Sequence, residues 1–149
     1  MSNILKKRDL IKIQKNEDPF LMMDEVEIIS ENHIKGKKKF HESFWVFKHH
    51  WPNDPNVPAV FQTETLTQIS SMIILSRKEY YNKTFLVVAA DKLKFKRKIV
   101  PNDILNVQSK LILFSRGLAK FVASGTVNNE FCCSGEFTMV LQEEIKKFI

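Results

Sequence analysis

The segment "PAVFQTETLTQISSMIILSRKEYY", Pro58 to Tyr81, has no glycine and no proline after its first residue, and it predicts one long helix. Proline suits the first helical position, where its missing N–H needs no partner. In the second half, apolar residues nearly encircle the helix axis, so we expect other elements to surround this helix. Glu64, Gln68 and Ser71 share one face of it. A carboxylate on an enclosed helix must be paired, protonated or functional.

Runs of strand length flank the helix, with turn residues between them. The expected strands are 19–30 and 33–47 before the helix, and 84–95, 103–115, 118–128 and 130–141 after it. A short helix with a basic face is expected within residues 1–14. Strands, one long helix and then consecutive strands are typical of an α+β fold, here an antiparallel sheet curled around a central helix. The chain has no linker or low-complexity stretch, which predicts a single domain over 1–149.

Composition narrows the class of protein without choosing a function. The chain has 149 residues, of which 44% are hydrophobic and 27% charged, as in an ordinary soluble domain. Its net charge of +6 predicts attraction to acidic partners: nucleic acid, an anionic membrane or an acidic carrier protein. Cys132 and Cys133 are neighbours, so a mutual disulfide is improbable and a reducing compartment fits. No run approaches the roughly 20 apolar residues that span a bilayer, and the amino terminus lacks an apolar signal core, so we expect a cytoplasmic protein without membrane insertion.

The stretch before the helix, "HHWPNDPNVP" from His49 to Pro58, joins a titratable ring to a stiff loop. Histidine changes its charge near neutral pH and serves as a general base. The prolines restrict the loop, which we expect to hold a histidine against the Glu64 helix. A metal site built from His41, His49, His50 and Glu64 has little support, because no tight ligand spacing or cysteine accompanies them. We therefore expect no metal and no cofactor.

Several runs, in one colinear order, resemble a known family. "HHWPN" (49–53), "VPA" (57–59) and "ETLTQ" (64–68) match the Gly-His-Phe-Pro-Gly loop and Glu-Ala-x-x-Gln helix of the β-hydroxyacyl-acyl-carrier-protein dehydratases of fatty-acid biosynthesis. "PFLMMDEV" (19–26) and "DKLKFKRKIVPND" (91–103) also resemble that family, and the likeness covers roughly residues 13–142. Three glycine positions of the family are His49, Asn53 and Ala59 here. The resemblance implies a hotdog fold.

The resemblance also implies an activity and a site. It implies a lyase that dehydrates 3-hydroxyacyl thioesters, with His50 as the base and Glu64 as the acid. The backbone N–H groups of Ala59 and Val60 would stabilise the thioester oxygen, and Gln68 would orient Glu64. In the family the histidine and the glutamate of one site come from different subunits, so a homodimer or a higher homo-oligomer is expected. The substrate would be linked to acyl carrier protein or to coenzyme A.

Three other functions remain as alternatives. A hotdog thioesterase would use Glu64 to activate water without His50, and a silent acyl-binding protein would fit the lost glycines. A nucleic-acid-binding module is disfavoured, because the aromatic residues lie in apolar runs and not on an open basic surface. One basic run has two interpretations, a solvated strand face or a docking patch for an acidic carrier: Lys92, Lys94, Lys96, Arg97 and Lys98. The alternation of its four lysines predicts that they share one face of a strand.

Overall fold

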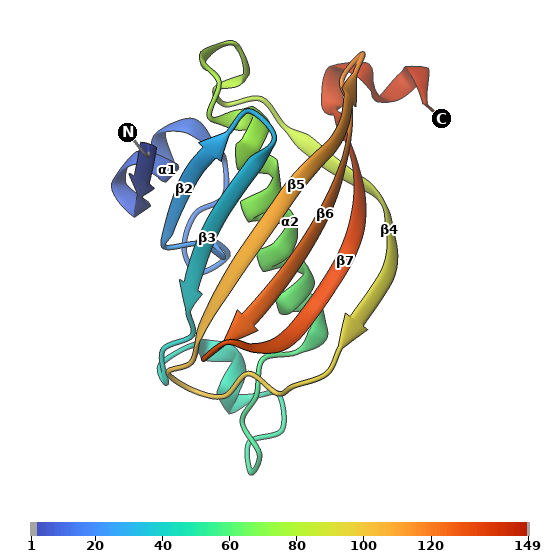
Figure 1. Cartoon of the computed structure of the whole chain (residues 1–149). Coiled ribbons are helices and arrows are strands. Elements are labelled where there is room, and N and C mark those ends of the chain that lie inside the picture. The colour runs from blue at the N-terminus through green and yellow to red at the C-terminus, as the bar shows by residue number, and fades with distance from the viewer. Residues whose placement is uncertain (1–2, 149) are drawn as a thin grey trace.

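The computed structural model describes residues 3–148 as a seven-stranded antiparallel sheet with one long helix against it (Figure 1). The elements are β1 (Asn3–Lys6), α1 (Lys7–Ile13), β2 (Glu25–Ser30), β3 (His33–Lys39), α2 (Ala59–Leu75), β4 (Phe85–Phe95), β5 (Ile104–Ser115), β6 (Leu118–Val127) and β7 (Glu130–Leu141), with 3₁₀ turns η1 (Trp45–Lys48), η2 (Lys78–Tyr80) and η3 (Gln142–Lys147). The strand order is β1-β2-β3-β5-β6-β7-β4, so β1 and β4 form the edges. The predicted α+β class is confirmed.

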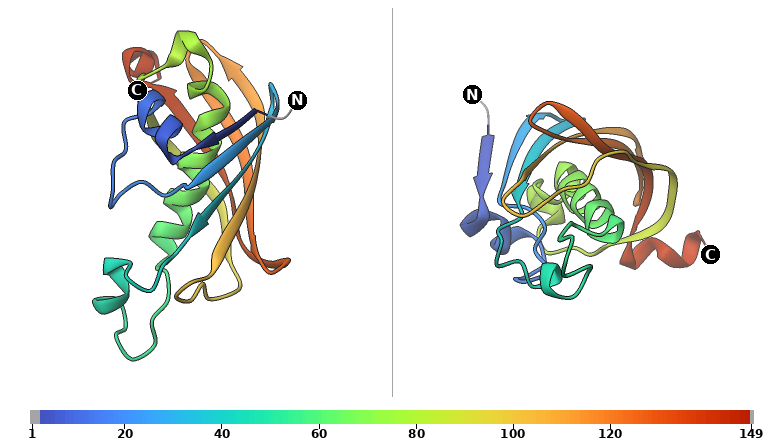
Figure 2. Two further views of the ribbon diagram at one scale, coloured as in Figure 1. Left: turned by 90° about the vertical axis from the view of Figure 1, so that its left-hand side faces the viewer. Right: turned by 90° about the horizontal axis from the view of Figure 1, so that it is seen from below.

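The sheet curls around α2, as the view along the molecule shows (Figure 2). Every residue of α2 from Thr65 to Leu75 is buried, which confirms the enclosed helix. At Gly36 on β3, an added Cβ would lie 2.9 Å from Cγ2 of Ile69, so glycine lets the strand approach the helix this closely. The hydroxyls of Ser70 on α2 and Ser109 on β5 are 2.7 Å apart and both buried. These contacts fix the depth of the helix, and with it the position of Glu64.

The long helix is shorter than predicted. It ends at Leu75, and residues 76–81 form a turn that includes η2. There the Arg77 guanidinium donates to the carbonyl of Glu31 at 3.0 Å, and the ring of Tyr80 packs on an aromatic ring of β5. These contacts with the sheet replace the continued helical ladder, and they explain why a proline-free sequence stops being helical.

Both strands predicted before the helix are also shorter. Residues 19–24 are irregular, and β2 begins only at Glu25. The second strand ends at Lys39; the Phe40 N–H still donates to the carbonyl of Asp103 (2.9 Å), and the chain then turns, with the Phe44 N–H donating to the carbonyl of His41 (2.8 Å). The predictions for 19–24 and 40–47 as strand are therefore wrong, although both runs are apolar enough to suggest it.

The remaining predictions of secondary structure agree closely with the structure. The four strands after the helix are present, and the turn between the last two has positive φ at Asn128 (49°) and Asn129 (64°). Within residues 1–14, Lys7–Ile13 are helical, Asn3–Lys6 form the edge strand β1, and residues 1 and 2 lie outside the described part. No helix between residues 3 and 148 is long and apolar enough to cross a membrane.

The edge strand β4 is exposed along most of its length. From Val87 to Phe95 every residue except Ala89 is exposed, and Val87 (48%) and Val88 (47%) lie at a shift of register against β7. On one side β4 pairs with β7, and its other edge has no strand beside it in the sheet order. An open edge with apolar side chains is a surface that proteins usually cover.

Candidate active site

Glu64 is held in place by one neighbour on its own helix, Gln68. The Gln68 amide donates to Oε1 of Glu64 at 2.7 Å and to the carbonyl of Phe20 at 2.9 Å. Its own oxygen accepts from the Met22 N–H at 2.8 Å. Gln68 is only 5% exposed, and these bonds use both of its N–H donors. The irregular segment after Pro19 therefore fixes Gln68, and Gln68 fixes the carboxyl group of Glu64.

A cavity of about 320 Å³ lies beside this carboxyl group. Its lining comes from α2, from β4 and from residues 14–16, and includes Thr67, Ser71, Leu75 and Phe85. The hydroxyl of Thr67 donates to the carbonyl of Glu64 (3.0 Å), and that of Ser71 donates to the carbonyl of Gln68 (2.7 Å). Both hydroxyls therefore already bond to their own helix. Glu64 is the ionisable side chain that α2 contributes to the lining of this cavity.

The amino-terminal end of α2 offers backbone donors. Pro58 is the N-cap residue and not the first helical residue as predicted, and Phe61 is the first N–H that donates back, to the carbonyl of Pro58 at 3.0 Å. The N–H groups of Ala59 and Val60 precede it, at the positive end of the helix dipole. Val60 is 70% exposed, and neither Ala59 nor Val60 lines the Glu64 cavity of the same chain. Such amides can stabilise a developing oxyanion.

His50 lies in the loop between η1 and α2, which projects from one end of the molecule (Figure 1). It is not among the residues lining the Glu64 cavity of its own chain. Its ring stacks on Trp51, with centroids 4.8 Å apart and an interplanar angle of 16°. One chain thus presents the two predicted groups at separate places.

The lost glycines of the loop are compatible with its backbone. Among residues 3–148, positive φ in this loop falls on Trp51 (49°), and not on His49, Asn53 or Ala59. The three substituted positions therefore do not require the left-handed conformation that favours glycine.

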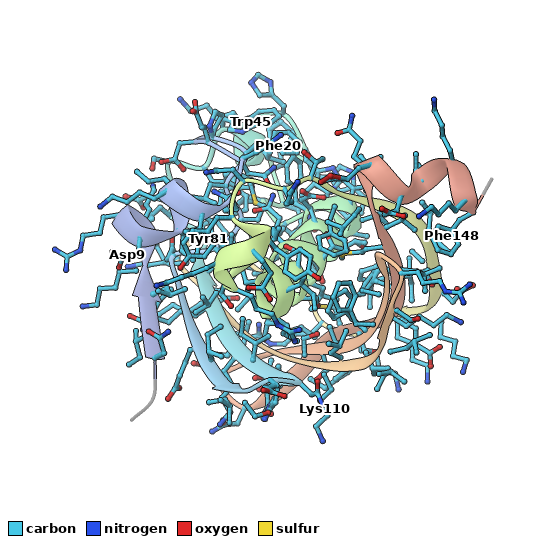
Figure 3. The ribbon with its side chains drawn as sticks, turned by 90° about the horizontal axis from the view of Figure 1, so that it is seen from above. Asp9, Phe20, Trp45, Tyr81, Lys110 and Phe148 are labelled. Carbon is cyan, nitrogen blue, oxygen red and sulfur yellow. The ribbon has the colours of Figure 1, made fainter. Side chains whose placement is uncertain are left out.

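Aromatic side chains gather beside the first turn of α2. Phe20 is 50% exposed and Trp45 44% exposed, and their rings lie 5.7 and 5.9 Å from that of Phe61. Figure 3 shows Phe20 and Trp45 on the same side of the molecule. The Trp45 and Phe61 rings meet edge to face, at 87°, so these rings pack on one another instead of forming an open stacking platform for bases.

Comparison with known proteins identifies the family. Residues 15–136 match the model of the FabA-like domain. The chain belongs to the FabA-like family. It is 30% identical over 123 residues to the 3-hydroxyacyl-[acyl-carrier-protein] dehydratase FabZ of Clostridium perfringens, covering 83% of this chain and 88% of that protein.

Solved structures agree on the fold. The dehydratase heterocomplex ApeI:P from Xenorhabdus doucetiae superposes with a TM-score of 0.78 at 12% identity, covering 93% of this chain and 95% of its own. A hypothetical thioesterase from Streptococcus pneumoniae, solved with coenzyme A, has a TM-score of 0.60 at 14% identity, covering 78% and 84% of the two chains. At such identities these likenesses show the hotdog fold, which confirms that prediction.

In this FabA-like chain the basic run does not form one strand face. β4 ends at Phe95, so Lys96 and Lys98 lie beyond it, and the predicted single face is wrong. Carboxylates of the same chain pair with three of the five cations: Lys92 with Glu136, Arg97 with Asp103 and Glu130, and Lys98 with Asp54. Within residues 3–148, Lys94 and Lys96 form no such ion pair, and docking of a carrier at the basic run stays a prediction.

Two other groups of residues are not candidates for the chemistry. Cys133 is fully buried, and burial raises the pKa of its thiol to about 12, so it is not a nucleophile at neutral pH. Burial also raises the pKa of Cys132. In the part of the FabA-like chain that the structure describes, residues 3–148, no three His, Cys, Asp or Glu side chains are grouped as metal ligands would be.

Two structural supports of the site are missed by reasoning from the sequence. One is the backbone of Phe20 and Met22, which bonds to Gln68; the run "PFLMM" is visible in the sequence, but its contact with the helix is not. The other is the ion pair between Asp54 and Lys98, whose members are 44 residues apart. No sequence pattern indicates that second contact.

Proposed function

We propose that this FabA-like protein is a dehydratase that acts on 3-hydroxyacyl thioesters, with a role in fatty-acid biosynthesis. The observation that carries the proposal is the carboxyl group of Glu64, which is bound by Gln68 and lies beside a cavity lined by the same helix. A carboxyl group whose position is fixed by a neighbouring amide is suited to act as a general acid. Family membership supplies the reaction class.

The proposed chemistry divides between two side chains. Neutral His50 removes the proton from the carbon next to the thioester carbonyl, and Glu64 protonates the hydroxyl at carbon 3 as its C–O bond breaks. A carbon–carbon double bond forms and water leaves with the proton from Glu64, while His50 holds the proton from the substrate carbon; exchange with solvent then resets both side chains. Negative charge grows on the thioester oxygen, where the N–H groups of Ala59 and Val60 stabilise it.

The proposed working unit is at least a homodimer. His50 of one copy would face Glu64 of the other, since His50 lies outside the cavity of its own chain. The exposed edge of β4 gives a second copy a surface to cover. The relatives' name supports acyl carrier protein as the acyl donor, and coenzyme A is the other thioester carrier. The free, buried cysteines support a reducing, cytoplasmic location.

A thioesterase is the second candidate function. The observation that favours it is that the cavity of one chain includes Glu64 without His50, and a carboxylate alone can activate water against a thioester. The two reactions leave different products, because a dehydratase yields a 2-enoyl thioester while a thioesterase releases a free thiol.

The test is to incubate 3-hydroxybutyryl thioesters with the protein and to measure enoyl product and thiol release together. We expect enoyl formation, with His50→Ala and Glu64→Gln each reducing turnover by about two to four decades. His49→Ala is the matched control, and it should retain activity. Thiol release that depends on Glu64 but not on His50 would establish the thioesterase instead. Acyl binding without either product would contradict both and identify a silent binding protein.

A further inference from the structure

A cluster outside the Glu64 cavity holds the loop that carries His50. The His50 ring stacks on Trp51, and Nζ of Lys98 lies 5.8 Å from the centroid of a Trp51 ring. Lys98 also forms an ion pair with Asp54, three residues further along the loop. Lys98 itself belongs to the segment between β4 and β5, so it ties the loop to the sheet. These four residues, His50, Trp51, Asp54 and Lys98, are called the loop clamp below.

The loop clamp includes the residue at which the loop backbone is strained. Trp51 has φ of 49°, in the left-handed region that bulky residues rarely adopt. Such a conformation persists only where its surroundings hold it. The Asp54 N–H donates to the carbonyl of Trp51 at 2.8 Å, and on either side the His50 N–H donates to Val46 and the Val57 N–H to Ile99, both at 2.8 Å. The backbone is thus fixed at three points, and Lys98 contacts the side chains between them.

The contacts of Lys98 are better suited to orienting the Trp51 ring than to stabilising the fold. The side chains of Lys98 and Asp54 are 53% and 56% exposed, and pairs so exposed contribute little to folding. A cation over an indole face is attracted by the ring and favours one orientation of it. The imidazole of His50 is nearly parallel to that indole, so a contact that holds Trp51 in one orientation also restricts the plane of the His50 ring.

We propose that Lys98 is a positioning residue for the reaction, acting through Trp51 on the imidazole of His50. The inference rests on the proposed function, because it assumes that His50 is the base. It gives Lys98 a role different from the carrier docking that the basic run suggests. A docking lysine acts on the carrier, whereas a lysine that positions the base acts on every substrate.

The experiment compares two substrates, a 3-hydroxyacyl group on acyl carrier protein and the same group on a short thiol without a carrier. Lys98→Met keeps the aliphatic stem and removes the charge. We expect it to lower kcat by about 10- to 100-fold on both substrates, the loss expected from a slightly misplaced catalytic group, with little change in KM or melting temperature. Lys98→Arg keeps a cation over the indole and should recover most of the activity. Lys110→Met, at an exposed position of β5 outside the proposed site and the basic run, is the matched control and should leave turnover of both substrates unaffected.

Each outcome discriminates between the explanations. A loss confined to carrier-linked substrate, and expressed in KM, would overturn the inference and assign Lys98 to docking. Unchanged kcat in Lys98→Met, while His50→Ala is inactive, would overturn the inference and leave the proposed function standing. Activity in His50→Ala equal to that of the unmodified protein would overturn the proposed function itself.

Discussion

At Gln68, a single side-chain amide connects the proposed acid to a segment 46 to 48 residues away in sequence. Removing it has two separate consequences. The Met22 N–H, a buried donor, loses its acceptor, and the carboxyl group of Glu64 loses the donor that orients it. The same residue therefore contributes to the stability of the fold and to the geometry of the site.

Substitutions at Gln68 should separate these two contributions. Gln68→Met removes every bond and should lower the free energy of unfolding by about 1–3 kcal/mol, the penalty for a buried unsatisfied group. Gln68→Glu keeps an acceptor for Met22 but places a second carboxyl group beside Glu64. It should reduce turnover at least as strongly as Gln68→Met. Chemical denaturation and turnover of a short 3-hydroxyacyl thioester measure the two effects. Full activity in both variants would contradict an orienting role.

Residue spacing explains which parts of the site could be read from the sequence. Glu64 and Gln68 are one helical turn apart, so their contact follows from helix geometry. Lys98 and Asp54 belong to different elements, and only the folded sheet brings them together. The strain at Trp51 is equally invisible, since nothing in "HWP" indicates a left-handed backbone at the tryptophan.

Among the elements, β4 shows that a local sequence pattern can predict the presence of a strand but not how its end divides a run of charged residues. Its length was predictable from the run 84–95, as was the Asn128–Asn129 turn between β6 and β7. Its end at Phe95 is not visible in the alternation of the lysines, which continues to Lys98 and therefore predicts a longer common face than the strand has. The ends of α2 and β2 depend on distant partners, which a local pattern does not contain: Glu31 for Arg77, and Gln68 for the backbone of residues 20–22.

The basic end of β4 leads to a prediction about the carrier. Lys94→Glu plus Lys96→Glu should slow turnover of carrier-linked substrate more than that of the short thioester, because an acidic carrier is steered by positive charge. The difference should shrink at high salt, where exposed charges are screened. The measurement is kcat/KM for both substrates at low and high ionic strength.

A matched variant uses a lysine that already has a partner. Lys92→Glu would place a carboxylate against Glu136, so Lys92→Gln is the better control, and it should alter the carrier preference less. Equal loss on both substrates in the Lys94 and Lys96 double variant would mean a damaged fold. No loss on either would identify these lysines as an ordinary solvated surface.

The whole molecule has the parts of two half-sites. His50 lies on the clamped loop at one end of the molecule, and Glu64 lies beside the cavity at α2. The α+β class and the enclosed helix follow from the order and apolar pattern of the segments. That the two groups lie apart in one chain follows from the three-dimensional arrangement, and it makes assembly part of the proposed mechanism.

The most direct test of this account mixes two inactive variants, His50→Ala and Glu64→Gln. If each site takes its histidine from one copy and its glutamate from the other, a mixed dimer has one site with both substitutions and one intact site. Random mixing makes half of the dimers mixed, so unfolding and refolding equal amounts together should restore about a quarter of the original turnover. Each variant refolded alone should remain inactive. No recovery in the mixture, with dimers demonstrated by light scattering, would contradict a site shared between two copies.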